Sequence, residues 1–209
     1  MQRFSLGFTL LELLVTIAIV GILSAMAIPS FNVLLQHNRA ISYTNQLTAA
    51  LNLARSEAVK QVQPVSVCPA TAGTSACGSD WSTGWMVFVD LTTVGSFDSG
   101  DTVIKYVQPR NNGVAVAAIY NGGTTPAASI GSYVQYLPTG FVNSSSYQNR
   151  SNGSFVICAI DLSGQNLGYP KLVSLNILGR VSLTATTAGD YCGQGSNGYE
   201  LCANGSACT

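Results

Sequence analysis

Six cysteines are the residues of this chain with the clearest capacity for chemistry. An even number in a region rich in Gly, Ser, Thr and Asn indicates disulfides formed in an oxidising compartment. Zinc sites usually contain Cys-x2-Cys pairs or nearby histidines, whereas no such pair occurs here and His37 lies far from the cysteines. We therefore predict disulfides and no metal site, the candidates being Cys68, Cys77, Cys158, Cys192, Cys202 and Cys208.

The spacing of the cysteines favours one local bridge. Cys68 and Cys77 would close a loop of about ten residues, so we predict that they pair. The other four cysteines allow three connectivities, and all three stay open. The stretch from Gly189 to Thr209 offers little apolar surface, so its cysteines are expected to tie it down.

The chain offers few groups for catalysis. His37 falls on the long N-terminal segment, where we interpret it as a polar residue at a membrane interface. No nucleophile elbow, phosphate-binding loop, HExxH or dinucleotide fingerprint occurs. Asp98 and Asp101 lack the further carboxylates of a calcium loop, so a turn is predicted, and the glycine-rich residues 193–198 are interpreted as a surface loop. We expect neither a cofactor nor enzymatic activity.

Charge is scarce and balanced, with 9 Lys and Arg against 9 Asp and Glu. From Val62 onward, five basic residues face seven acidic ones, which gives a net charge of −2. A nucleic-acid-binding domain usually has the opposite sign and clustered Lys and Arg.

Glu12 is a carboxylate at the start of a long apolar segment. The residues from Leu13 to Gln36 carry no formal charge, and these 24 residues would form a helix of about 36 Å, enough for a hydrocarbon core of about 30 Å. A signal peptide normally has a shorter apolar region of about 7–15 residues. A carboxylate entering a bilayer costs about 2.5–3.5 kcal/mol, so Glu12 requires a partner. The nearest cation in the chain is Arg3.

The segment Gly7-Phe8-Thr9-Leu10-Leu11-Glu12 resembles the processing site of type IV prepilins and type II secretion pseudopilins. The resemblance implies that residues 1–7 are a leader, that a membrane peptidase cuts between Gly7 and Phe8, and that the new N-terminus is methylated. It also supplies a partner for Glu12, namely the Phe8 ammonium group of a neighbouring subunit. Glu12 would then set the register of assembly.

Two segments follow the leader. Residues 8–30 are predicted to be the transmembrane and filament-core helix, with a kink or local unwinding at Pro29. Residues 31–61 are predicted to continue the helix in amphipathic form. The side chains expected to pack on the rest of the chain are Leu34, Ile41, Leu47, Leu51, Ala54 and Ala58, and those expected in water are Arg39, Asn45, Asn52 and Lys60.

Residues 62–209 are predicted to form a β-rich globular head. Short β-branched and aromatic runs, separated by turn formers and without helices between them, indicate antiparallel sheets. Leu178-Gly179 is expected to form a tight hairpin turn. The expected strands are 65–68, 85–90, 102–108, 114–120, 132–137, 154–160, 171–176 and 180–185. The predicted fold class is therefore α+β, a long hydrophobic N-terminal helix packed on an antiparallel β-rich head.

The order of several motifs resembles the GspH/FimT/FimU group of minor pilins and pseudopilins. The motifs are Asn52–Lys60, Pro64–Cys68, Gly84–Asp90, Leu137–Phe141 and Gly179–Val181. The resemblance implies the fold of this group, a long N-terminal helix packed on a β-rich head, which is the type IV pilin-like fold.

The resemblance implies a minor pilin that helps to initiate or cap a type IV pilus, a filament of twitching motility, adhesion and DNA uptake. Its implied partners are other minor and major pilins and the prepilin peptidase. Its implied location is the bacterial inner membrane, crossed once with the head in the periplasm, and then the filament or its tip at the cell surface.

Two alternatives stay open. One is a minor pseudopilin of a type II secretion system, although the cysteine-rich tail favours a surface-exposed pilus head. The other is a DNA-binding pilin for natural transformation, because some FimT-like proteins use a Gly-Arg-x-Arg hairpin. Here Arg180 is the candidate DNA contact, but Ser182 replaces the second arginine, and the negative head opposes DNA binding.

Overall fold

A computed structural model of the 209-residue chain describes residues 9–71, 76–108, 114–120, 133–143, 152–160, 170–185, 193–195 and 198–200. Within these ranges it describes the backbone alone for residues 26–30, 115, 117–120, 152, 184–185, 193–195 and 198–200. Contacts divide the chain into two compact units, Met1–Leu35 and Gln36–Thr209. The processing residues Gly7 and Phe8 lie outside the described residues.

One helix, α1 (Leu10–Gln61), contributes to both units. In the first unit, the side chains described from Leu10 to Leu35 are all exposed. Position 29 is helical, so the local unwinding expected at Pro29 is not seen, while the Pro29 side chain lies outside the described residues.

In the part of the chain that the structure describes, no helix is both long enough and apolar enough to cross a membrane.

The second unit contains two four-stranded antiparallel sheets. The order in the first is β3-β2-β1-β5, made of β1 (Val65–Pro69), β2 (Trp85–Val89), β3 (Thr102–Val107) and β5 (Val134–Tyr136). The order in the second is β4-β6-β7-β8, made of β4 (Val114–Tyr120), β6 (Asn152–Ala159), β7 (Lys171–Asn176) and β8 (Val181–Ala185). A short 3-10 helix, η1 (Trp81–Thr83), precedes β2.

The eight predicted strands are all present, with ends within two residues of those expected. The surface-loop interpretation of residues 193–198 is wrong, because β9 (Gly193–Gly195) pairs with β10 (Gly198–Glu200) in a two-stranded sheet. Pairing here uses backbone groups, and a run of glycines has no alternating side-chain pattern from which a strand could be predicted.

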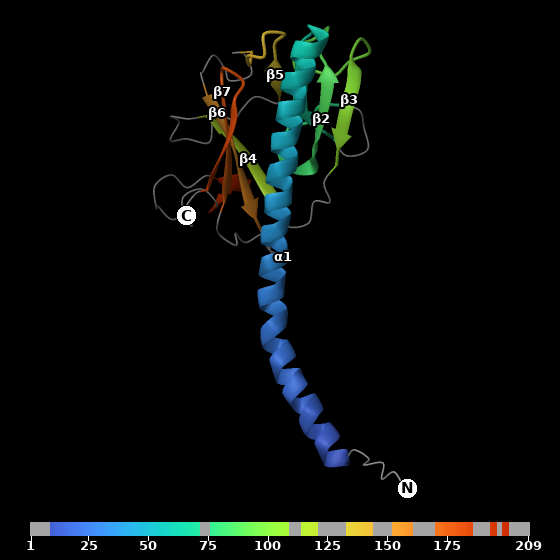
Figure 1. Cartoon of the computed structure of the whole chain (residues 1–209), viewed down its shortest axis with the longest axis vertical. Coiled ribbons are helices and arrows are strands. Elements are labelled where there is room, and N and C mark those ends of the chain that lie inside the picture. The colour runs from blue at the N-terminus through green and yellow to red at the C-terminus, as the bar shows by residue number, and fades with distance from the viewer. Residues whose placement is uncertain are drawn as a thin grey trace, which may run out of the picture. The chain divides into compact units, whose positions relative to one another are not determined.

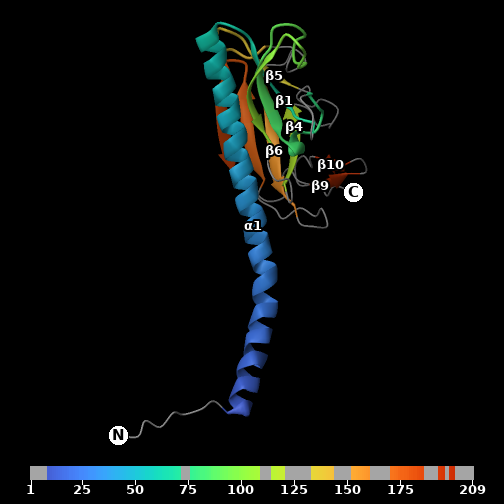
Figure 2. The ribbon, with the colours of Figure 1, turned by 90° about the vertical axis from the view of Figure 1, so that its right-hand side faces the viewer.

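The part of α1 that belongs to the second unit packs across both sheets (Figure 1). Figure 2 shows this helix on one side of the strands. Its buried face consists largely of small or branched residues, which let the helix approach the sheets closely. The largest buried side chains opposite it are Trp85, Tyr136 and Phe155. The buried hydrophobic positions of the helix are Ala40, Tyr43, Leu47, Ala50, Leu51, Ala54 and Ala58.

Tyr43 determines which side of the helix faces the sheets. Its ring lies edge-on to Trp85 with centroids 5.0 Å apart, and its hydroxyl donates to the Trp81 carbonyl oxygen. Burial, with a smaller contribution from the Asp80 carboxylate, raises the pKa of Tyr43. Tyr43 therefore stays neutral and keeps its donor at physiological pH.

The predicted packing face was correct for four residues and wrong for two. Leu47, Leu51, Ala54 and Ala58 are buried, whereas Ile41 and Leu34 are exposed. Because Tyr43 is anchored in the second unit, Ala40, three residues earlier on the same face of the helix, is buried as well. Ile41 lies on the outer surface. The four positions predicted to be exposed to solvent are indeed exposed, namely Arg39, Asn45, Asn52 and Lys60.

The first sheet is also covered on the face that points away from α1. Met86 and Phe88 alternate with the helix-facing residues of β2 and form a second buried cluster with Cys68 and Ala70. Phe97 packs edge-on to Phe88, with centroids 5.4 Å apart. Because both faces are covered, every residue of β2 is buried.

The end of α1 contains a residue in an unusual conformation. Gln63 N–H donates to the Ala58 carbonyl oxygen at 3.3 Å, closing the helix as in a Schellman motif. Val62 occupies the left-handed position of this motif, with φ of 56°. A left-handed conformation costs an L-residue about 1–2 kcal/mol, and β-branched residues rarely adopt it.

Replacing Val62 by Asn should stabilise the protein by about 1 kcal/mol, because Asn tolerates the left-handed conformation. Thermal unfolding of the full chain in detergent should show a melting temperature higher by about 2–4 °C. Val59→Asn, the same change on helical backbone, should not raise it. An unchanged or lower melting temperature for Val62→Asn would contradict the strain assigned to this position.

Candidate functional site

Glu12 lies in the first turn of α1. Its backbone N–H donates to Thr9 Oγ1 at 3.2 Å, and Leu13 N–H donates to the Thr9 carbonyl oxygen at 3.2 Å. Thr9 is therefore the N-cap, and Glu12 occupies the third helical position, as in a Thr-x-x-Glu capping box. Sequence reasoning missed this role of Thr9, although the capping pattern was present.

The position of Glu12 suits a negative charge. A carboxylate near a helix N-terminus is stabilised by the helix dipole by about 0.3–1 kcal/mol. The Glu12 side chain is exposed, and among the described residues no cation forms an ion pair with it. Its carboxylate is thus available to a group from outside the described chain.

Arg55 connects α1 to two loops that are distant in sequence. Its Nε donates to the Gly140 carbonyl oxygen at 3.1 Å, and its NH2 group donates to the Leu178 carbonyl oxygen at 3.0 Å. The two loops also contact each other, since Val142 N–H donates to the Ile177 carbonyl oxygen at 2.9 Å. We call this meeting point of helix and loops the Arg55 junction.

Two glycines make the Arg55 junction sterically feasible. Gly140 and Gly179 both have positive φ, of 78° and 76°. A methyl group on Gly179 would lie 2.2 Å from the Gly140 carbonyl oxygen, so any side chain there would separate the loops. The ring of Tyr136 lies beneath Gly179, and burial raises the pKa of Tyr136, an effect that the Arg55 charge opposes.

The hairpin between β7 and β8 is as predicted. Gly179 N–H donates to the Asn176 carbonyl oxygen at 2.9 Å, which closes the turn. The side chain of Arg180 is exposed, and so is that of Ser182, whose hydroxyl lies 3.5 Å from the Ser174 carbonyl oxygen. The hairpin therefore presents a single cation where a Gly-Arg-x-Arg motif would present two.

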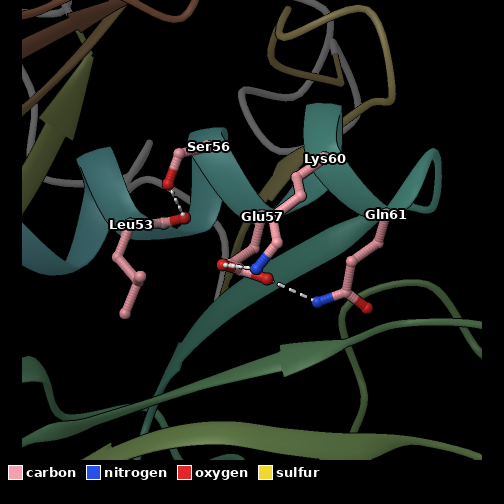
Figure 3. A network of polar contacts seen from close by, with 5 residues as sticks. All are labelled: Leu53, Ser56, Glu57, Lys60 and Gln61. Atoms are coloured by element: carbon pink, nitrogen blue, oxygen red, sulfur yellow. Dashed lines mark hydrogen bonds and ion pairs between the residues drawn. The ribbon is translucent and has the colours of Figure 1, made fainter.

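A network of polar side chains lies on the last turns of α1 (Figure 3). Glu57 accepts from Gln61 at 2.6 Å and from Lys60 at 3.2 Å. Both hydrogen bonds lower the pKa of Glu57, and the one from Gln61 has the larger effect. Lys60 is 74% exposed, so this ion pair contributes little to stability, but it neutralises the lysine.

Asp90 is a buried carboxylate at the end of β2. Its Oδ2 accepts from Ser66 Oγ, from Gly95 N–H at 2.7 Å and from Gln135 Nε2 at 2.8 Å. These donors come from β1, from the loop after β2 and from β5, so one carboxylate joins three segments of the first sheet. The role is structural, because hydrogen-bonded donors surround this oxygen.

The loop after β2 is held by its own carboxylates. Asp101 Oδ1 accepts from Leu91 N–H at 2.9 Å and Oδ2 from Asp98 N–H at 3.1 Å. Asp98 accepts from the Thr92 hydroxyl and from Gly100 N–H, and these hydrogen bonds lower the pKa of Asp98. The carboxylates therefore serve the turn that the sequence predicted.

The disulfide between Cys68 and Cys77 is present, as predicted. It joins β1 to the segment at 76–78 and belongs to the second buried cluster. Cys158, on β6, is also disulfide-bonded. Cys192, Cys202 and Cys208 lie outside the described residues, so the pairing of Cys158 stays open.

Within the described ranges, no three His, Cys, Asp or Glu side chains are grouped as a metal site would require. His37 is half-buried on α1.

A helix with an exposed apolar N-terminal part, continuing into a helix-covered antiparallel head, defines a type IV pilin-like subunit. Residues 3–28 match the prokaryotic N-terminal methylation motif, and residues 43–179 match the family of Type II transport protein GspH. The second match covers more than half of the chain, so the chain belongs to the GspH family of minor pilins and pseudopilins.

Solved structures of two such proteins are similar. The type IV minor pilin FimU of Pseudomonas aeruginosa has a TM-score of 0.50 and 19% identity, over 73% of this chain and 96% of FimU. The minor pseudopilin EpsH from the Type 2 Secretion System of Vibrio cholerae has a TM-score of 0.45 and 15% identity, over 70% of this chain and 97% of EpsH. At 19% identity, the likeness to FimU concerns the fold alone. No curated protein sequence matches the chain.

Replacing Arg55 by Met should destabilise the head by about 2 kcal/mol, because two carbonyl oxygens lose a charged donor. Denaturant unfolding of the full chain in detergent, followed by the fluorescence of the buried Trp81 and Trp85, measures this. Lys60→Met, which removes an exposed ion pair one turn away, should cost less than about 1 kcal/mol. Equal effects of the two substitutions would contradict the role given to the Arg55 junction.

Asp98 should contribute to the acid sensitivity of the head. Because the pKa of Asp98 is lower in the folded state, its ionised form stabilises the fold above the unfolded value of about 3.9. This contribution is lost as the pH falls through the folded pKa. The stability difference between the wild type and Asp98→Asn should therefore shrink between about pH 5 and pH 2 in denaturant titrations. A difference that stays constant over this range would contradict the assignment.

Proposed function

We propose that this chain is a minor pilin that helps to initiate or cap a type IV pilus. The observation that carries the proposal is the exposed apolar surface of α1 between Leu10 and Leu35, which needs lipid or other helices to cover it. The match to the methylation motif over residues 3–28 supports processing at Gly7 and Phe8. The proposed partners are therefore the prepilin peptidase and the helices of other minor and major pilins.

The apolar part of α1 serves two environments in this proposal. Before assembly it lies in the inner membrane, with the head in the periplasm, and after assembly it packs among the helices of the filament. The apolar side chains around the helix suit both situations, since lipid and neighbouring helices each cover all sides of it. Leu10 and Leu11, at the helix start, are 80% and 73% exposed.

Glu12 gives the assembly its register in this proposal. The Phe8 ammonium of a neighbouring subunit would neutralise the carboxylate once both are removed from water. Such a pair forms only when the two groups meet in good geometry, so it selects one axial position. The Thr9 cap supports this role because it orders the turn that carries Glu12.

The same architecture would serve a minor pseudopilin of a type II secretion system. We favour the pilus because a head with disulfides, Cys68–Cys77 among them, suits exposure at the cell surface. DNA binding gains no support from the hairpin, where Arg180 stands without a second arginine. The head also has a net charge of −2 from Val62 onward.

Glu12→Ala should leave the protein in the inner membrane and reduce its amount in the filament on the order of tenfold or more, because an unpaired ammonium group would stay buried. Immunoblots of membranes and of filaments sheared from the cells measure both quantities. Glu57→Ala, which removes a glutamate of the head, is the matched control and should leave incorporation unchanged. Normal recovery of Glu12→Ala in sheared filaments would contradict the role of Glu12 in setting the register of assembly. Absence of the wild-type chain from sheared filaments would contradict the proposed function.

A further inference from the structure

Apolar side chains are exposed together around the Arg55 junction. Val59 on α1 is 50% exposed, Phe141 is 48%, and Ile177 and Leu178 at the hairpin tip are 36% and 49%. We call these four residues, together with the exposed Arg180, the junction patch. Exposed apolar side chains that form a patch mark an interaction surface more often than single exposed ones do.

Two contacts show that the segments carrying the junction patch adjoin one another. Val59 Cγ2 lies 3.2 Å from the position of a methyl group on Gly140, the residue before Phe141. The hydrogen bond from Val142 N–H to the Ile177 carbonyl oxygen, at 2.9 Å, joins the loop of Phe141 to the hairpin tip. The helix, loop and hairpin segments that carry the exposed side chains therefore meet at one place.

The junction patch is rigid, which favours binding. Arg55 holds both loops from the helix through their carbonyl oxygens. The turn after β5 is closed by hydrogen bonds from Leu137 N–H to the Phe141 carbonyl oxygen and from Gly140 N–H to the Leu137 carbonyl oxygen, both at 2.8 Å. A surface ordered before binding loses less conformational entropy on association.

Charge indicates the chemistry of the partner. Within the described ranges Arg180 forms no ion pair, whereas Lys60 is already neutralised by Glu57. The patch thus presents one available guanidinium beside an aromatic and three aliphatic side chains. DNA would need several cations along its backbone, whereas a protein surface with a carboxylate among apolar groups matches this composition.

We propose that the junction patch is the surface by which the head binds another subunit of the filament, at a site where a carboxylate is flanked by apolar side chains. Phe141 and Leu178 would enter the apolar part of that site, and Arg180 would pair with the carboxylate. Buried aromatic and arginine side chains typically dominate such interfaces. The proposal rests on the proposed function, because it requires a filament of other subunits.

Photocrosslinking in filament-producing cells tests the proposal with the full chain. p-Benzoylphenylalanine in place of Phe141 should form an adduct with another filament subunit, and the crosslinked peptide, identified by mass spectrometry, should contain Asp or Glu. The matched control places the same probe at Tyr106 on β3, an aromatic residue that is 41% exposed, and should give little adduct. Arg180→Glu should reduce the Phe141 adduct about tenfold, whereas Arg180→Lys should retain most of it.

Several results would overturn the proposal. They are adducts of the Phe141 probe with DNA, lipid or a second copy of this chain alone, equal adducts from the Tyr106 probe, and no effect of Arg180→Glu. Whether the chain is present in sheared filaments distinguishes failure of the junction-patch proposal from failure of the proposed function. If the chain is present there but Phe141 forms no adduct, only the junction patch is wrong. If the chain is absent from them, the proposed function fails and the inference fails with it.

Discussion

The burial of one face of α1 against two antiparallel sheets is the interaction on which the head depends. The helix contributes Leu47, Leu51, Ala54 and Ala58, and the sheets contribute large side chains such as Trp85 and Phe155. Because small helix residues face large sheet residues, the backbones approach closely and the two sheets share one core.

Polar groups then join the segments that the core leaves apart. Arg55 attaches the helix to two loops, and Asp90 attaches β2 to β1 and β5. In both cases one charged group hydrogen-bonds to donors or acceptors from segments distant in sequence, so its removal would leave several polar groups without these partners. Arg55 and Asp90 thus serve the architecture of the head, while exposed apolar side chains and Arg180 form the junction patch.

Much of the fold could be predicted from local pattern. Runs of β-branched residues gave the eight strands, and turn formers gave the hairpin at Leu178-Gly179, because these signals depend on neighbours in sequence. The helix face was only partly predictable. Apolar spacing alone could not choose between Ile41 and the Ala40–Tyr43 side, since the choice depends on the contacts of Tyr43 with Trp81 and Trp85. Strands β9 and β10 were missed because glycine carries no side-chain pattern.

The Glu12 position and the methylation motif are readable in the first residues of the chain, since a carboxylate beside a long uncharged segment is a matter of order and spacing alone. The local bridge between Cys68 and Cys77 was readable for the same reason. The Arg55 junction was not. Arg55, Gly140 and Leu178 lie far apart in sequence, and nothing in their local patterns connects them. Only folding of the sheets against α1 brings the Arg55 guanidinium within hydrogen-bond distance of the Gly140 and Leu178 carbonyl oxygens, and it brings the segments of the junction patch together at the same place.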